Sequence, residues 1–223
     1  TIIRTKAHVR ARSYFKERFV SNSSWANVIL HMYNSFDYLR KSPCKSFVAA
    51  VKCIFLRQNN DNNNYENADI IFDLNKNIPN ELKDKFDYIY DGGTIEHIFN
   101  IPQVLENIID MLTVGGIFCS ITCNNNFSGH GFYQFSPELF IRCFALKYGM
   151  EILEIYLAEN HSDPSKWIKL PITFIQENSR ITDKFKTNNE VYIITIARKI
   201  KNDGKKLLTD FPQQYRYEKI EWI

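Results

Sequence analysis

Hydrophobic and polar residues follow different patterns in the two parts of this chain. Between residues 24 and 55, apolar side chains recur every three or four positions, which predicts amphipathic helices. Residues 58–67, QNNDNNNYEN, are too polar to enter a core, so we interpret them as a loop. We therefore expect a helical N-terminal cap at residues 1–57 and a larger domain at residues 58–223, which together form one compact unit.

After residue 67, short apolar segments with strand character alternate with segments of helical spacing. The predicted strands are residues 68–73 (ADIIFD), 86–91 (FDYIYD), 117–123 (IFCSITC), 151–158 and 190–198. One predicted helix begins at Asn100 and Pro102 and ends at TVGG, residues 113–116. Another runs from Ser136 to Tyr148, and Gly149 stops it. This order predicts a Rossmann-like α/β fold, with helices on both faces of a sheet and a helical N-terminal extension.

Composition and charge narrow the choice of partners. The net charge of +3 is too small to argue for a nucleic-acid partner. No apolar run approaches the roughly 18 residues of a membrane span, and the N-terminus has no apolar signal core, so we expect a cytoplasmic protein without a membrane partner. The five cysteines form no C-x-x-C pair, and no His/Cys/Asp/Glu group has the spacing of metal ligands. The sequence therefore predicts no metal site.

The segment FDYIYDGGTIEHI, residues 86–98, carries the clearest candidate chemistry. A strand ends at Asp91, Gly92 and Gly93, and an acid next to a histidine follows at Glu96 and His97. Ligands of α/β sheets bind outside the carboxyl ends of strands, and adjacent glycines there allow the backbone to approach a ligand closely. A simple tight turn is the alternative interpretation.

Five segments, taken in order, resemble the second half of a class I S-adenosylmethionine-dependent methyltransferase. They are DIIFDLNKNIP, FDYIYDGGTIEHI, MLTVGGIFCSIT, HGFYQFSPELF and EILEIYL, and they cover residues 69 to about 158. The resemblance implies that S-adenosylmethionine is the cofactor. It also implies that Asp73 and Leu74 contact the adenine, and that Asp91, Gly92 and Gly93 border the methionine part and the sulfonium. An aspartate that caps the following turn is the other interpretation of Asp73.

The resemblance gives roles to two histidines. Methyl transfer from a sulfonium is an in-line displacement, and an oxygen or nitrogen acceptor gains from a nearby base. In some relatives the histidine at the position of His97 is that base or orients the acceptor, with Glu96 beside it. In others the pair is structural, and the glutamate caps the following helix. His130, which lies between two glycines, is an alternative base.

Residues 124–135, NNNFSGHGFYQF, resemble an acceptor-side loop. Its polar residues Asn126, Tyr133 and Gln134 have the groups that hydrogen-bond a polyol or sugar. We therefore expect a small polar acceptor, with a sugar or sugar-nucleotide precursor as the leading choice. The tail FPQQYRY, residues 211–217, also resembles the ending of some family members associated with surface-polysaccharide or small-molecule modification, which implies that the precursor belongs to a surface polysaccharide. An ordinary surface loop is the alternative. A homodimer is compatible with the sequence.

The chain departs from the family pattern before residue 69. Class I methyltransferases usually open with a strand ending in G-x-G-x-G, but no glycine precedes Gly92, and Glu66 is the sole local candidate for the acid that holds the ribose. A segment is missing, the cofactor site is built differently, or the protein is a degenerate relative. The last option is the rival hypothesis, a catalytically inactive binding or assembly protein. A nucleotide-dependent oxidoreductase is a third, and it would need a G-x-G-x-x-G turn.

Overall fold

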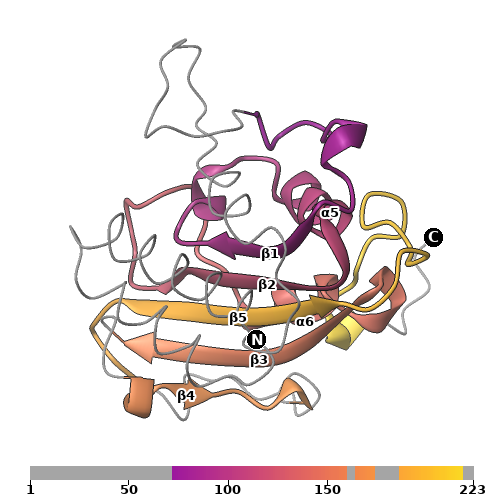
Figure 1. The fold of residues 1–223 in the computed structure, drawn as a ribbon. Helices are drawn as coiled ribbons and strands as arrows, with labels where there is room; N and C mark the ends of the chain where they lie inside the picture. The colour runs from indigo at the N-terminus through magenta and orange to yellow at the C-terminus, as the bar shows by residue number, and fades with distance from the viewer. Residues whose placement is uncertain (1–71, 160–163, 174–185, 218–223) are drawn as a thin grey trace, which may run out of the picture.

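A computed structural model describes residues 72–159, 164–173 and 186–217, and its centre is a five-stranded sheet in the order β1-β2-β5-β3-β4 (Figure 1). Strands β1 and β2 are parallel, whereas β5 is antiparallel to both of its neighbours, β2 and β3. The last long strand of the chain is therefore inserted between two earlier ones. The strands are β1 (Phe86–Asp91), β2 (Leu112–Asn125), β3 (Met150–Glu159), β4 (Ile168–Lys169) and β5 (Val191–Lys199).

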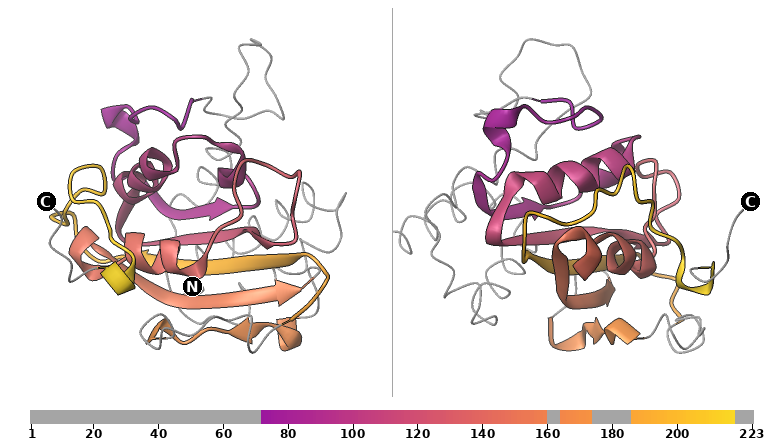
Figure 2. Two further views of the ribbon diagram at one scale, coloured as in Figure 1. Left: turned by 180° about the vertical axis from the view of Figure 1, so that it is seen from behind. Right: turned by 90° about the vertical axis from the view of Figure 1, so that its right-hand side faces the viewer.

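Two α-helices connect these strands, α5 (Ile101–Met111) between β1 and β2 and α6 (Pro137–Cys143) between β2 and β3. Seen from behind, both helices lie in front of the sheet (Figure 2). Val104 of α5, Phe140 of α6 and Phe118 of β2 belong to one buried apolar cluster, so both helices cover the same face. Short 3₁₀ turns complete the description: η2 (Asn80–Leu82), η3 (Ile95–His97), η4 (Leu146–Tyr148), η5 (Pro164–Lys166) and η8 (Tyr215–Tyr217).

The opposite face of the sheet carries a second buried apolar cluster. Its side chains include Tyr88 and Tyr90 of β1, Cys119 of β2 and Ile196 of β5. Neither described helix contributes to this cluster. The Rossmann-like α/β fold predicted from the sequence is confirmed, while the helical cover of this second face stays a prediction. Neither α5 nor α6 has the length and hydrophobicity that crossing a membrane requires.

Local signals explain where the elements begin and end. Ser136 caps α6, because its hydroxyl oxygen accepts a hydrogen bond from the Glu138 amide at 3.3 Å. Gly149, with a φ of +77°, ends the separate 3₁₀ turn η4 rather than the helix that it was predicted to stop. The predicted strands at 86–91, 117–123, 151–158 and 190–198 all occur, three of them with ends shifted by no more than one residue.

Two predicted helix ends are wrong. The TVGG sequence does not end a helix: α5 stops at Met111, and residues 113–116 form a bulge in β2 between Leu112 and Ile117, which pair with Phe86 and Tyr88. The second helix ends at Cys143 rather than Tyr148, because Phe144 leaves the helical conformation and its ring is fully buried in the core.

Some predictions fall on residues that the structure does not describe. The N-terminal cap at 1–57, the loop at 58–67, Glu66 and most of the strand predicted at 68–73 lie outside the described residues. Within residues 72–73 there is no strand. The proposed domain boundary therefore stays a prediction.

Candidate functional site

Asp91 lies at the carboxyl end of β1 and is completely buried. Its carboxylate accepts hydrogen bonds from the Ser120 hydroxyl at 2.7 Å and from the Thr94 amide at 2.9 Å. In the sheet, Ser120 pairs with Asp91 on one side and with Thr195 of β5 on the other. The Thr195 hydroxyl is buried and has no hydrogen-bond partner among the residues that the structure describes. A row of buried polar side chains thus crosses three strands of the sheet.

The environment of Asp91 disfavours its charge. Burial, and then the neighbouring carboxylate of Glu96, raise the pKa of Asp91 from 3.8 to about 7, although the Ser120 hydroxyl and the backbone amides act against them. Burial also raises the pKa of Tyr90 well above its ordinary value and that of Cys119 to about 12. These two neighbours are therefore neutral near pH 7, where Asp91 titrates.

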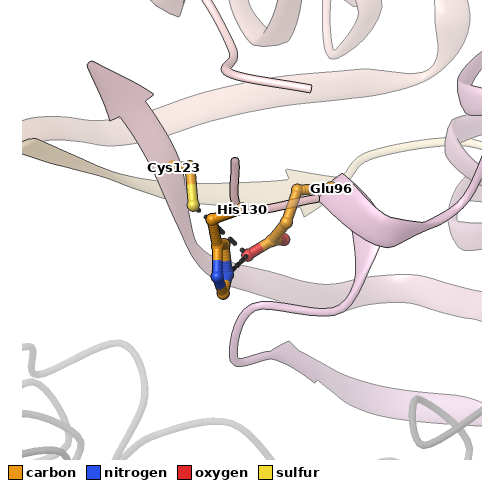
Figure 3. Close-up of side chains that lie close together, drawn as sticks. All are labelled: Glu96, Cys123 and His130. Carbon is orange, nitrogen blue, oxygen red and sulfur yellow. Dashed lines mark hydrogen bonds and ion pairs between the residues drawn. The ribbon is translucent and has the colours of Figure 1, made fainter. Parts of the chain in front are cut away.

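Glu96, in the turn η3, is the second buried acid, with 1% of its surface exposed. One carboxylate oxygen accepts from the Thr122 hydroxyl at 2.7 Å. The other lies 3.5 Å from the Cys123 sulfur and 3.8 Å from Nε2 of His130. Figure 3 shows Glu96 and His130 pointing toward each other beside Cys123. Burial and Glu96 raise the pKa of the Cys123 thiol to about 12.

The backbone around Glu96 fixes the loop that carries His130. The Glu96 carbonyl accepts hydrogen bonds from the amides of Phe132 and Tyr133, at 2.7 and 3.3 Å. Gly131 has a φ of +70°, and a Cβ atom there would lie 2.8 Å from the Glu96 carbonyl oxygen. Glycine is therefore required at this close approach.

His97 stands at the exposed rim of the same site. Its ring meets that of His130 edge to face, with centroids 4.9 Å apart. Two aromatic rings lie exposed in the neighbouring segments, Phe99 at 66% and Phe132 at 60%, with centroids 6.0 Å apart. The structure therefore brings the two predicted histidines together beside an apolar surface.

The glycines predicted to border the cofactor pack closely against their own chain. Gly93 has a φ of +92°, and a Cβ atom there would lie 3.1 Å from a carboxylate oxygen of Glu96. Gly92 is exposed, and a Cβ atom there would lie 2.9 Å from the Tyr90 ring. The paired glycines therefore allow the chain to turn closely over the side chains of Tyr90 and Glu96 after β1. The backbone remains accessible to solvent at Gly92.

Asp73 and Leu74 occupy a turn away from this cluster. The Asp73 carboxylate accepts from the amide and side chain of Asn75, at 3.0 and 2.9 Å, which is the geometry of the turn-capping interpretation. Those hydrogen bonds lower the pKa of Asp73. Leu74 is buried in the core. Asn75 also binds Asn100, so this turn is attached to the segment that follows His97.

The residues predicted to bind the methyl acceptor already make hydrogen bonds to other residues of the chain. Asn126 donates to the carbonyl oxygens of Thr187 and Asn189, at 3.1 and 2.7 Å. The Tyr133 hydroxyl donates to the Phe99 carbonyl at 2.8 Å. The Gln134 side chain accepts from the Phe127 amide at 2.9 Å. These contacts give the loop a defined shape, so its side chains do not project freely into the site.

Sequence reasoning missed Ser120, Thr122 and Cys123 as members of the site. They lie in a segment, IFCSITC, that we interpreted as a buried strand; its end at Cys123 and Asn124 was noted as a strand end of the kind that borders ligands, but none of the three side chains received a role. The available signal was the pair of hydroxyl residues at positions two apart, which places both on one face of an apolar strand. Their partners became visible only with the register of β1 against β2.

Residues 52–139 match a family model described as a methyltransferase domain. A comparison with curated proteins finds no match. Among solved structures, a protein from Bacillus halodurans described as a candidate methyltransferase is 11% identical, with 59% of this chain and 77% of that chain covered and a TM-score of 0.41. A Mesorhizobium loti S-adenosylmethionine-dependent methyltransferase is 14% identical, with 58% and 68% covered and a TM-score of 0.38.

A third similar structure is the 1,6-didemethyltoxoflavin-N1-methyltransferase of Burkholderia thailandensis with S-adenosylhomocysteine bound. It is 12% identical, with 59% of this chain and 50% of that chain covered and a TM-score of 0.37. The family model covers less than half of the chain, and its match agrees with the resemblance of these segments to class I S-adenosylmethionine-dependent methyltransferases.

Proposed function

We propose that this chain transfers the methyl group of S-adenosylmethionine to an oxygen or nitrogen of a small polar acceptor. The observation that carries the proposal is the group formed by Asp91, Glu96 and His97 at the carboxyl end of β1, where α/β sheets bind their ligands. Methyl transfer mainly requires that the methyl donor and the acceptor are held in line, with a base near the acceptor.

In this proposal the two sides of the site have separate tasks. The backbone of Asp91, Gly92 and Gly93 borders the methionine part and the sulfonium, while Asp73 and Leu74 serve the adenine. Support comes from the exposure of Gly92 and from the close turn at Gly93. His97, an exposed imidazole in the turn that follows, takes the proton of the acceptor, and His130 is the alternative base.

A sugar or sugar-nucleotide precursor of a surface polysaccharide is the acceptor that we propose. The hydroxyl and amide groups of the 126–135 loop suit a polyol, with Asn126, Tyr133 and Gln134 as binding residues after a change of partners. The exposed rings of Phe99 and Phe132 offer an apolar surface for the C–H face of a sugar. Such precursors are made in the cytoplasm, where we place the protein.

Calorimetric titration with S-adenosylmethionine and S-adenosylhomocysteine tests the cofactor side. We expect micromolar dissociation constants, about 8 kcal/mol of binding free energy. Gly93→Ala should weaken both by at least tenfold, because a Cβ atom at a φ of +92° strains the turn and lies 3.1 Å from the Glu96 carboxylate.

Gly129→Ala is the matched control for that substitution. Gly129 has a φ of +89°, so its backbone is strained to the same degree by alanine, yet a Cβ atom there meets nothing within 4 Å. Its cofactor affinity should equal that of the wild type. Folded protein that binds neither ligand would contradict the proposal and favour the non-catalytic interpretation, and equal losses in the two variants would remove Gly93 from the cofactor site.

A further inference from the structure

We propose that Glu96, Cys123 and His130 bind one divalent transition-metal ion of the Zn²⁺ type. Each residue offers one ligand atom, and these atoms all lie within 4.8 Å of one another. The three residues come from the turn after β1, from the end of β2 and from the loop that follows β2 (Figure 3). The inference does not require S-adenosylmethionine to bind, so it stands or falls separately from the proposed function.

The distances are close to those that a tetrahedral site needs. Zinc bonds of about 2.3 Å to sulfur and 2.0–2.1 Å to nitrogen or oxygen place neighbouring ligand atoms roughly 3.3–3.6 Å apart. The Glu96 oxygen already lies 3.5 Å from the Cys123 sulfur and 3.8 Å from Nε2 of His130. A small inward movement of His130 alone completes the site.

The His130 side chain can make that movement by rotating on its docked loop, because it is 54% exposed. The other two ligands are held firmly, because Glu96 and Cys123 are each about 1% exposed. The site therefore combines two fixed ligands with one adjustable ligand that faces solvent, which gives an ion a way in.

The charge of the site also favours a cation. Glu96 is a buried acid whose sole ion-pair partner among the described residues is the imidazole of His130, at 3.8 Å. Buried carboxylates are costly unless a positive charge or strong hydrogen bonds balance them. A dication between these three side chains supplies the positive charge that the described residues do not.

The donor set selects the kind of metal. When an ion binds, Cys123 releases its thiol proton to solvent and coordinates as a thiolate. One thiolate, one imidazole and one carboxylate suit Zn²⁺ or Co²⁺, whereas Mg²⁺ and Ca²⁺ prefer oxygen ligands throughout. Three protein ligands leave one tetrahedral position open, as in zinc sites that act on a bound molecule. The exposed ligand of the set, His130, lies against His97 at the rim, next to the acceptor side of the proposed active site.

Titration of the chelator-treated full-length protein with Co²⁺ tests the site without any assay of activity. We expect one ion per chain and a thiolate-to-cobalt charge-transfer absorption band. Zn²⁺ should displace the cobalt and raise the thermal midpoint of the wild type, because an ion that binds only the folded chain stabilises it. The uptake of Zn²⁺ is then counted by equilibrium dialysis and elemental analysis.

Four variants separate the ligands from their neighbours. His130→Gln, an exposed loop substitution, should weaken Zn²⁺ binding at least about a hundredfold, whereas His97→Gln should leave it within a few-fold of the wild type. Cys123→Ser should abolish the charge-transfer band, while Cys143→Ser, a second buried free cysteine, should keep it. The thermal midpoint without metal shows that each variant is folded.

Absence of cobalt or zinc binding by the folded wild type overturns the proposal. So does binding that survives both His130→Gln and Cys123→Ser. In either case, the contact of Glu96 with His130 serves only to hold the loop. Cofactor titration of the same metal-free protein then reports independently on the proposed function.

Discussion

Asp91→Asn should be more stable than the wild-type protein at pH 8, with a gain of at most about 4 kcal/mol. Burial and Glu96 raise the pKa of the folded Asp91 carboxyl from 3.8 to about 7. Below pH 3.8 the group is protonated in both states and favours neither. As the pH rises to about 7 only the unfolded chain releases its proton freely, so the wild type loses stability over this window. Asparagine keeps the shape and one acceptor oxygen but carries no charge.

Chemical unfolding of both proteins at pH 5, 6, 7 and 8 measures this difference. The advantage of Asp91→Asn should grow through this range and level off above pH 7. Ser120→Ala should change the stability in the opposite direction, because it removes the 2.7 Å hydrogen bond that favours the charged Asp91 carboxylate. The loss in free energy of unfolding caused by Ser120→Ala should therefore be greater at pH 8 than at pH 5. Parallel pH profiles for all three proteins would show that Asp91 titrates at the same pH whether folded or not.

A stabilising substitution at this position would also bear on function. Proteins keep destabilising buried charges mainly where a ligand or a reaction needs them. In our proposal, Asp91 borders a cofactor that carries a positive sulfonium, and a nearby cation favours the ionised carboxylate. Asp91→Asn should therefore gain stability while its affinity for S-adenosylmethionine falls.

The strands were predictable from the sequence because their signals are local. Residues 86–91 alternate, and the glycines at 92 and 93 mark the end, so the prediction and β1 agree at both ends. The helix end predicted at TVGG was wrong for a physical reason. Paired glycines are equally suited to a helix end and to a strand bulge, and only the register of β1 with β2 decides between the two. The end of the second helix was predicted wrongly because spacing of three to four residues also describes a short α-helix followed by a 3₁₀ turn, as in α6 and η4.

The site was predictable only where it follows a strand end. Asp91 and Glu96 were found because they stand at the carboxyl end of β1. Their partners Thr122 and Cys123 lie 26 and 27 positions from Glu96, and the hydroxyl pair in their segment does not show which residue they face. His130 was noticed for its flanking glycines, but its contact with Glu96 depends on a loop docked through backbone amides. No sequence spacing encodes a cluster assembled from three separate segments.

His97→Gln should slow methyl transfer by about 10²–10⁴-fold, which is the usual contribution of a general base. Of the two histidines at the rim, His97 is the one that lies outside the three-residue metal cluster, so its imidazole stays available to an acceptor. Transfer of a labelled methyl group from S-adenosylmethionine to a panel of sugars, sugar nucleotides and small amines finds the acceptor. The same assay then compares the variant with the wild type.

Chemical rescue distinguishes a base from a residue that only supports the fold. Imidazole added to His97→Ala should restore part of the lost rate, because a small base can occupy the space of the missing ring. His130→Ala should not recover in this way, since a metal ligand must be fixed to its loop. A double variant His97→Gln/His130→Gln that keeps normal turnover would contradict both catalytic roles. Retained cofactor affinity and zinc uptake in His97→Gln would confine its defect to the chemical step, and the base would then act from the rim of a site whose interior is built around Glu96.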